Sequence, residues 1–384
     1  MNAPQLNLPI GIQTFSQIIT GGYYYADKTG QIARLLKQDK YYFLSRPRRF
    51  GKSLLLDTLK ELLECNEPLF RGLAVHDQWD WATPAPVIEI SFNDGGLETR
   101  HDLEQRMINL LKQNSHRLAL PWKETSNPVD GLRELIHSAH EKYGQRVAIL
   151  VDEYDKPILD HINNPAIAFS MRECLDGFFS VIDDADAQLR FVFITGSAKF
   201  NSPTMTNSLD ILRDISLCPE YASLCGFTDA ELDTVFMPAL IGLDRQAIKT
   251  QYKGYNWLGE AVYNPWDILL LLRERSFQPW WYESCPPTFL HKLLTERPIR
   301  LPAHDNLKAD AKLLSSFDGN TTSTTAILFQ AGYLTIEKEE RVGGNYYYSL
   351  RFPNRAVEQC LAWVSQWLSF HLNYTPKVQL IRKK

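Results

Sequence analysis

The chain has 384 residues, of which 44% are hydrophobic, 12% aromatic and 22% charged, and its formal net charge is −4. This is the composition of a globular protein too long for one ordinary core, so we expect two or three domains. The charge gives no global case for nucleic-acid binding, and no apolar run approaches the length that crosses a bilayer, so we expect no membrane association.

The start of the chain and its cysteines suggest where the protein works. Residues 1–5 show neither the charged region nor the apolar core of a secretory signal. The six cysteines are scattered and form no Cys-x-x-Cys pair. Reduced thiols in a cytoplasmic protein are therefore the expectation.

The first forty residues predict a lead-in with a short helix over residues 28–37. An aromatic loop at Tyr23, Tyr24 and Tyr25 precedes this helix. These rings suit either stacking on an adenine base or ordinary packing, and the sequence favours packing.

Residues 41–56 predict a buried strand, a compact loop with the sequence RPRRFGKS, and an apolar helix. This order suits phosphate binding, because the strand fixes the loop and the helix N-terminus points free N–H groups at an anion. Lys52 would reach the β- and γ-phosphates, and the Ser53 hydroxyl would ligate Mg²⁺. The nucleotide-binding residues predicted here are Arg46, Pro47, Arg48, Arg49, Phe50, Gly51, Lys52, Ser53 and Leu54.

One position of this loop departs from the general pattern GxxxxGK[ST]. Arg46 replaces the first glycine, which most easily takes a positive φ, so the turn must be built differently, around Pro47. The cations of the segment also suit a surface cluster that binds nucleic acid or lies in solvent. The phosphate interpretation therefore needs a second motif.

That second motif follows a predicted strand at residues 86–92 and two amphipathic helices at 101–120 and 129–142. Residues 147–151 form an apolar run that ends in Asp152 and Glu153, as in a parallel strand buried on both faces. Asp152 would hold the Mg²⁺ shell and Glu153 would polarise the attacking water. The plainer alternative is a strand capped by solvated acids.

A helix at 169–182 leads to another apolar strand, residues 190–197. Thr195 near its end is the candidate for sensing the γ-phosphate or positioning the water, with Ser197 as second choice. A threonine that merely ends a strand is an equal alternative. The alternation of strands and helices predicts an α/β fold, a P-loop NTPase parallel sheet sandwiched by helices, within residues 1–225.

The rest of the chain predicts two smaller regions. Thr228 and Glu231 form a capping box that opens a helical lid over residues 226–304. Residues 305–384 predict a winged-helix-like α+β region with a helix at 323–330, a hairpin turning at Gly343 and Gly344, and a basic tail. This region offers a surface for a DNA or protein partner, although neighbouring glutamates favour a packing role.

The chain resembles the predicted AAA-ATPase-like family of bacterial proteins from about residue 8 to residue 355. The segments that carry the resemblance are 8–12, 25–29, 43–53, 151–157, 193–200, 214–217, 221–228 and 328–334. The family's own loop is similar to RPRRF, so Arg46 is not by itself evidence of inactivity. The resemblance implies ATP and Mg²⁺ as ligands and adds Asp27, in segment 25–29, to the nucleotide-binding residues. A strand between the two motifs in the chain, with a glutamate after the aspartate, resembles the additional-strand class of P-loop ATPases.

The function favoured by these motifs is Mg²⁺-dependent ATP binding with slow hydrolysis, used as a conformational switch. Lys52, Asp152, Glu153 and Thr195 are the expected catalytic residues. An arginine, Arg213 or Arg172, would act on the phosphoryl group in cis or from a neighbouring subunit of a homo-oligomer.

Two other functions stay open. One is a nucleotide-gated module with little turnover that binds DNA or protein through its C-terminal region. The other is a nuclease, since family members often carry a further restriction-endonuclease-like domain. The residues after Arg355 show no acid pair and lysine at nuclease spacing, so we do not transfer that activity.

Overall fold

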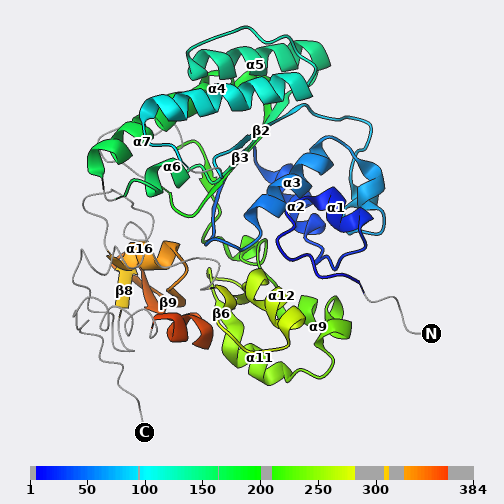
Figure 1. Ribbon diagram of the computed structural model, residues 1–384, viewed down its shortest axis with the longest axis vertical. Helices are drawn as coiled ribbons and strands as arrows, with labels where there is room; N and C mark the ends of the chain where they lie inside the picture. Colours follow the sequence, from blue (N-terminus) through cyan, green and yellow to red (C-terminus); the bar gives the residue numbers. More distant parts are fainter. Residues whose placement is uncertain are drawn as a thin grey trace.

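The computed structural model describes residues 6–93, 96–162, 164–199, 210–281, 307–310 and 324–361. At its centre lies a five-stranded sheet in the order β2-β3-β4-β1-β5, in which all neighbours are parallel (Figure 1). The strands are β1 Tyr41–Ser45, β2 Val87–Ser91, β3 Val147–Asp152, β4 Leu189–Gly196 and β5 Arg213–Asp214. The predicted parallel α/β core is therefore confirmed.

Strand β3 is buried along its whole length, and β4 is buried at every position except one. Helices that cover both faces of a parallel sheet account for such continuous apolar runs. Strand β2 comes between β1 and β3 in the chain, yet it lies at the edge of the sheet beside β3. It is β4 that separates β1 from β3 in space.

Helices flank this sheet in two groups. Helices α4, α5 and α7 pack together, and α1 and α3 lie on the other side of the view (Figure 1). Their bounds are α1 Phe15–Thr20, α2 Thr29–Gln38, α3 Lys52–Leu63, α4 Arg100–Arg117, α5 Pro128–Tyr143, α6 Lys156–Leu159, α7 Pro165–Phe179 and α8 Val181–Asp184. Short helical turns stand at η1 Glu67–Phe70, η2 His76–Gln78, η3 Asp186–Gln188 and η4 Pro219–Tyr221. No helix among the described residues is long and apolar enough to cross a membrane.

Local sequence sets where the long helices begin and end. Helix α4 starts with a capping box, because the side chains of Thr99 and Asp102 each accept a hydrogen bond from the other's backbone N–H. Before α5, Asn127 accepts from the N–H of Val129, and Pro128 occupies the first helical position. Gly144 then ends α5 with a φ of 60°.

A second region follows the sheet. It contains α9 Asp229–Thr234, α10 Met237–Leu240, α11 Arg245–Tyr252 and α12 Pro265–Glu274, with a small antiparallel pair, β6 Lys253–Tyr255 and β7 Val262–Tyr263. The capping box of Thr228 and Glu231 is confirmed at the start of α9. The region has its own apolar core, to which Tyr24 and Ala26 of the lead-in contribute. The sequence had predicted only helices here, and it missed the β6–β7 pair.

The C-terminal module, as we call residues 307–310 and 324–361, joins helix α16 Thr324–Gln330 to a three-stranded antiparallel sheet. Its strands are β8 Leu307–Asp310, β9 Thr335–Val342 and β10 Asn345–Arg351. The predicted helix and hairpin are present, with the turn at Gly343 and Gly344. The basic tail and the remainder of the predicted winged helix lie outside the described residues, so that name stays a prediction.

The second region buries one carboxyl group without a cation. Asp267 of α12 is fully buried, and its Oδ1 accepts a hydrogen bond of 2.7 Å from the N–H of Trp281. Its Oδ2 has no partner among the described residues. Burial raises the pKa of Asp267 to about 7.

Asp267→Asn should therefore stabilise the protein more at pH 8 than at pH 5. A carboxyl whose folded pKa lies above its unfolded pKa takes up a proton on folding, so its contribution to stability falls as pH rises toward the folded pKa. Between pH 5 and pH 8 the advantage of the variant should grow by about 2 kcal/mol. Thermal melts of both proteins at the two pH values measure this. An equal effect at both would contradict the raised pKa.

Candidate functional site

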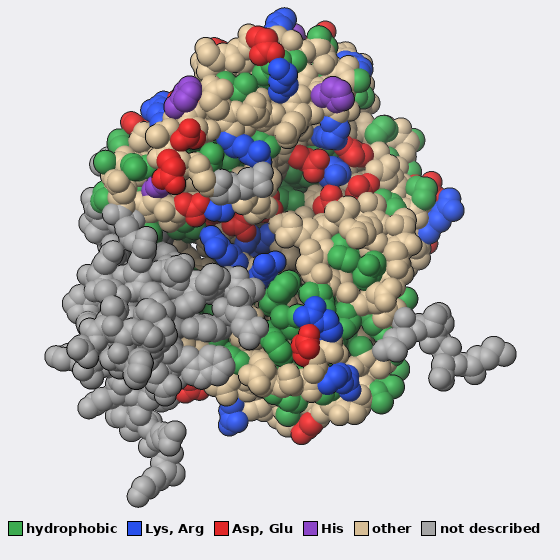
Figure 2. Space-filling view, in the orientation of Figure 1, with side chains coloured by type: hydrophobic (Ala, Val, Ile, Leu, Met, Phe, Trp, Pro, Cys, Tyr) green, Lys and Arg blue, Asp and Glu red, His purple; other side chains and the backbone are tan. Residues whose placement is uncertain are grey.

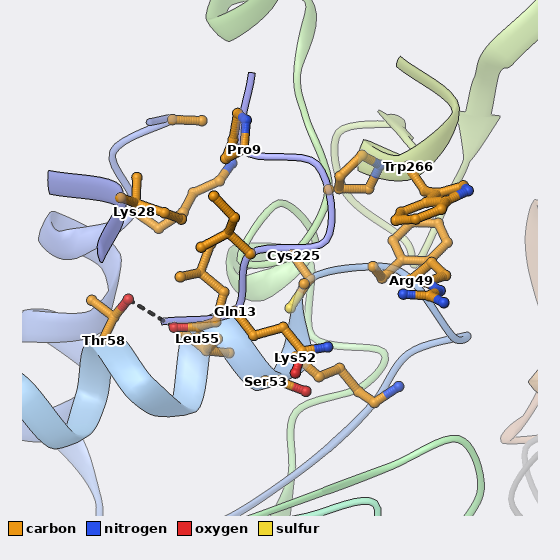
Figure 3. A pocket seen from close by; sticks show the side chains of 18 of the residues that line it. Pro9, Gln13, Lys28, Arg49, Lys52, Ser53, Leu55, Thr58, Cys225 and Trp266 are labelled. Atoms are coloured by element: carbon orange, nitrogen blue, oxygen red, sulfur yellow. Dashed lines mark hydrogen bonds between the residues drawn. The ribbon is translucent and has the colours of Figure 1, made fainter. Parts of the chain in front are cut away.

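The loop between β1 and α3 lies where the sheet presents its carboxyl ends. Gly51, with a φ of 94°, precedes the first residue of α3, and Arg49 also has a positive φ of 67°. Helix α3 begins at Lys52, so the first N–H groups of the helix lack intrahelical partners, which is the arrangement that favours an anion. The loop borders a cavity of about 470 Å³ (Figure 3).

Lys52 is buried and makes an ion pair with Glu153. Its Nζ lies 3.0 Å from Glu153 Oε1 and also donates to the carbonyl oxygens of Arg46, at 2.9 Å, and Pro47, at 3.3 Å. Burial alone lowers the pKa of Lys52, but the charges of Glu153 and Asp152 outweigh it and raise that pKa. For Glu153, burial raises the pKa and the Lys52 ammonium more than reverses this, so the carboxylate is ionised at neutral pH.

Asp152 gathers polar side chains from three other segments. Its Oδ2 accepts from the hydroxyl of Ser53 at 2.6 Å and from the amide of Asn93 at 2.9 Å. Its Oδ1 accepts from the hydroxyl of Thr195 at 2.8 Å. The structure thus brings together Ser53, Asp152 and Thr195, which the sequence predicted from separate motifs. Asn93 was missed, although a polar residue just after a predicted strand is a signal that could have identified it.

Asp155 is a further acid that the sequence did not single out. It is fully buried, and its Oδ2 accepts from the N–H groups of Ser197, at 2.8 Å, and Ala198, at 2.7 Å. Burial, with the charge of Glu153 added, raises the pKa of Asp155 to about 7. A side chain on Gly196 would meet Asp155 Oδ1 at 2.6 Å, so this close approach requires glycine.

The backbone of Glu153 is strained. Its φ is 52°, in the left-handed region that residues with a side chain seldom adopt. Such conformations cost about 1–3 kcal/mol and gather at functional sites, where the surrounding contacts hold them. Here the ion pair with Lys52 is the contact that fixes the side chain.

Three residues predicted to bind nucleotide do not line the cavity. The Arg46 guanidinium is fully buried, donates to the carbonyl oxygens of Ser45, Ser216 and Tyr221 at 2.7–3.2 Å, and lies 4.1 Å from the ring centre of Trp257. Burial lowers the pKa of Arg46 to about 10. Pro47 is buried as well. Asp27 accepts from the N–H groups of Thr29 and Ala74, which ties the start of α2 to a neighbouring loop.

The other predicted loop residues line the cavity. These are Arg48, Arg49, Phe50, Gly51, Lys52, Ser53 and Leu54. Figure 2 shows Lys and Arg side chains gathered near the centre of one face of the molecule, beside a hollow. Arg213, in contrast, pairs with Asp39 at 3.0 Å beside the first residues of β1, at the end of that strand opposite the loop.

The remaining walls of the cavity are largely apolar. They come from the lead-in, from α3 and from α12, and include Ile12, Tyr24, Tyr25, Leu55 and Trp266. The Arg49 guanidinium lies 4.3 Å from the ring centre of Trp266 (Figure 3). Tyr24 and Tyr25 also pack on Phe236 and Phe15, with ring centres 5.4 and 5.2 Å apart, as the sequence favoured, and their stacking on an adenine stays a prediction. The cavity therefore combines the cationic side chains of the loop with a largely apolar wall.

Comparison with known proteins agrees with this geometry. A family model described as "Predicted AAA-ATPase" matches residues 9–206, a range that holds the loop, Asp152, Glu153 and Thr195. A protein of Azotobacter chroococcum mcd 1, described as an uncharacterized protein in the vnfD 5' region, is 50% identical over 355 residues. The alignment covers 92% of this chain and 69% of that protein.

Lys52 and Glu153 should stabilise the fold as a pair. Lys52→Ala leaves a buried carboxylate without its cation and should lower the free energy of unfolding by about 3 kcal/mol. Adding Glu153→Gln to that variant removes the orphaned charge and should restore part of the loss. Urea unfolding of both single variants and the double variant, without nucleotide, measures the coupling. Losses that add to within about 0.5 kcal/mol would contradict the pairing.

Proposed function

The chain belongs to the predicted AAA-ATPase family, and on that premise we propose that it binds Mg²⁺–ATP at the loop and hydrolyses it slowly as a conformational switch. The observation that carries the proposal is the contact of Ser53, Asp152 and Thr195 directly beside the Lys52–Glu153 pair. Three separate segments contribute these groups, namely the start of α3, the end of β3 and the end of β4, and Lys52, Ser53 and Glu153 among them line the cavity. An anion-binding helix terminus, a lysine, a hydroxyl and two acids are the parts that phosphoryl transfer needs.

The residues present fit a magnesium ion. Mg²⁺ prefers oxygen ligands and is usually held by one or two carboxylates, with water and substrate phosphates completing its shell. The Ser53 hydroxyl and the Asp152 carboxylate lie 2.6 Å apart and supply such oxygens. When bound, Mg²⁺ would offset negative charge on the β- and γ-phosphates.

Lys52 and Glu153 would couple the binding of ATP to its hydrolysis. A phosphate that takes the Lys52 ammonium competes with Glu153 for the same cation. Once released, the Glu153 carboxylate is free to accept a proton from the attacking water. While Lys52 is paired with Glu153, the pKa of Glu153 is lowered and that of Asp155 is raised, so Asp155 is the first of the two carboxyls to take up a proton as pH falls.

The apolar wall of the cavity suits a purine ring. A volume of about 470 Å³ lies within the range of small-molecule sites. The family supports ATP over GTP as the nucleotide. Thr195 contacts Asp152 from the neighbouring strand and would position the water or contact the γ-phosphate.

A nucleotide-gated module with little turnover is the second candidate. The observation that favours it is the engagement of Glu153 by Lys52, since a base held in an ion pair is poorly placed to activate water. For its partner we favour protein over DNA. Lys308 and Lys338 both pair with Glu340 at 2.9 Å, which removes cations that a DNA backbone would need.

ATP with Mg²⁺ should raise the melting temperature of the wild-type protein by several degrees. A ligand at 100 times its Kd adds about 2.7 kcal/mol to the stability of the folded state. Thermal shift with ATP, GTP and ADP, with and without Mg²⁺, measures this. Lys52→Ala should abolish the shift, and Ser53→Ala should abolish its dependence on Mg²⁺. A wild-type protein that responds to no nucleotide would refute the proposal.

Glu153→Gln should separate hydrolysis from binding. The variant keeps the shape of the side chain but loses the proton acceptor, so the rate of phosphate release should fall at least about 100-fold while ATP still binds. Measurement of turnover and of Kd on the same preparation gives both values. If wild type binds ATP tightly yet releases phosphate no faster than Glu153→Gln does, the second candidate function is preferred.

A further inference from the structure

We call residues 46–51, between β1 and α3, the phosphate loop. Its outer side touches the C-terminal module. Gly332, in the turn between α16 and β9, lies so close to Pro47 that a side-chain Cβ at Gly332 would be 2.8 Å from Pro47 Cβ and 2.9 Å from its Cγ. Real Cβ atoms do not approach other carbons so closely. Two segments almost 300 residues apart in the chain therefore meet at the loop expected to hold phosphate.

Other contacts fasten this turn in place. The Thr335 hydroxyl accepts from the N–H of Asn256 at 2.7 Å and donates to the carbonyl oxygen of Asn256 at 3.0 Å. The Tyr333 ring lies 5.0 Å from that of Trp281, which is buried. A Cβ on Gly254 would lie only 1.9 Å from the Pro353 carbonyl oxygen. The C-terminal module is thus docked closely at several points.

The same loop also packs against aromatic residues of the second region. Phe50 packs edge-on against Tyr255 and Trp257, with ring centres 4.7 and 5.2 Å apart, and Arg46 lies over the same Trp257. On the inner side, the Lys52 ammonium donates to the carbonyl oxygen of Pro47. A phosphate that takes this ammonium removes a partner from the residue on which Gly332 rests.

We propose that Gly332 is a positioning residue of the nucleotide site, and that docking of the C-terminal module on Pro47 is energetically linked to nucleotide binding. This inference rests on the proposed function and adds its regulation. Through the contact of Gly332 with Pro47, the C-terminal module holds the phosphate loop in the conformation that binds nucleotide. Because such coupling is reciprocal, a partner that pulls the turn away from Pro47 weakens nucleotide binding, and nucleotide in turn changes how firmly the module is docked.

Two glycine variants of the full chain test the proposal. Gly332 and Gly344 have nearly identical φ values of 86° and 87°, so an alanine at either position adopts an unfavourable positive φ. No atom lies within 4 Å of a Cβ on Gly344, whereas a Cβ on Gly332 meets Pro47. Gly332→Ala should weaken ATP binding about ten-fold in calorimetry, within the usual range of coupling, and Gly344→Ala should bind as wild type does.

A double variant separates positioning from general damage. Pro47→Gly removes the ring atoms that the new methyl group meets. Adding Gly332→Ala to Pro47→Gly should therefore lower ATP affinity by much less than Gly332→Ala lowers it in the wild-type background. A purely structural defect in the C-terminal module would give the same factor in both backgrounds, and that result overturns the proposal.

Hydrogen exchange tests the link in the wild-type protein, even if the variants fold poorly. ATP with Mg²⁺ should change amide exchange in residues 329–335 and leave the hairpin turn at residues 342–346 unchanged. If ATP binds but residues 329–335 do not respond, and Gly332→Ala binds as Gly344→Ala does, the inference is wrong while the proposed function stands. If the wild-type protein binds no nucleotide, both the inference and the proposed function are wrong.

Discussion

The parallel register of the central sheet is the constraint on which the rest of the structure depends. It pairs Ser45 with Gly196 and Ser91 with Asp152, so the strands end at a common edge. Every group of the candidate site lies at that edge, either in the last two residues of a strand or in the loop or first helical turn that follows a strand. A shift of one residue in β3 would turn Asp152 to the opposite face and separate it from Ser53 and Thr195.

This edge concentrates charge inside an apolar core, which is costly unless each charge is paired. The protein meets the cost in three ways. Lys52 neutralises Glu153, neutral donors occupy both oxygens of Asp152, and the pKa of Asp155 is raised so that its carboxyl gains a proton more readily. Such a network is rigid because separating a buried group from its charge or hydrogen-bond partner is costly. The strained backbone of Glu153 is tolerated for the same reason.

The sequence predicted those parts whose signal is local. Strands β3 and β4 were recognisable as continuous apolar runs, and the glycine-lysine-serine turn marked the start of α3. What escaped prediction depends on partners far away in the chain. Nothing near Arg46 reveals that its guanidinium binds the carbonyl oxygens of Ser216 and Tyr221 rather than a phosphate. Asp155 and Gly332 likewise acquire their roles only through contacts made on folding.

The arginine at the head of the phosphate loop also changes what evolution can vary. In the general pattern, a positive φ at the first loop position favours glycine, and that one residue is enough. Here Arg46 has no positive φ, and its guanidinium stacks on Trp257 and reaches carbonyl oxygens about 170 residues downstream. Insertions or deletions near those positions should therefore be rare among relatives that keep the arginine, and the aromatic ring at position 257 should vary together with it.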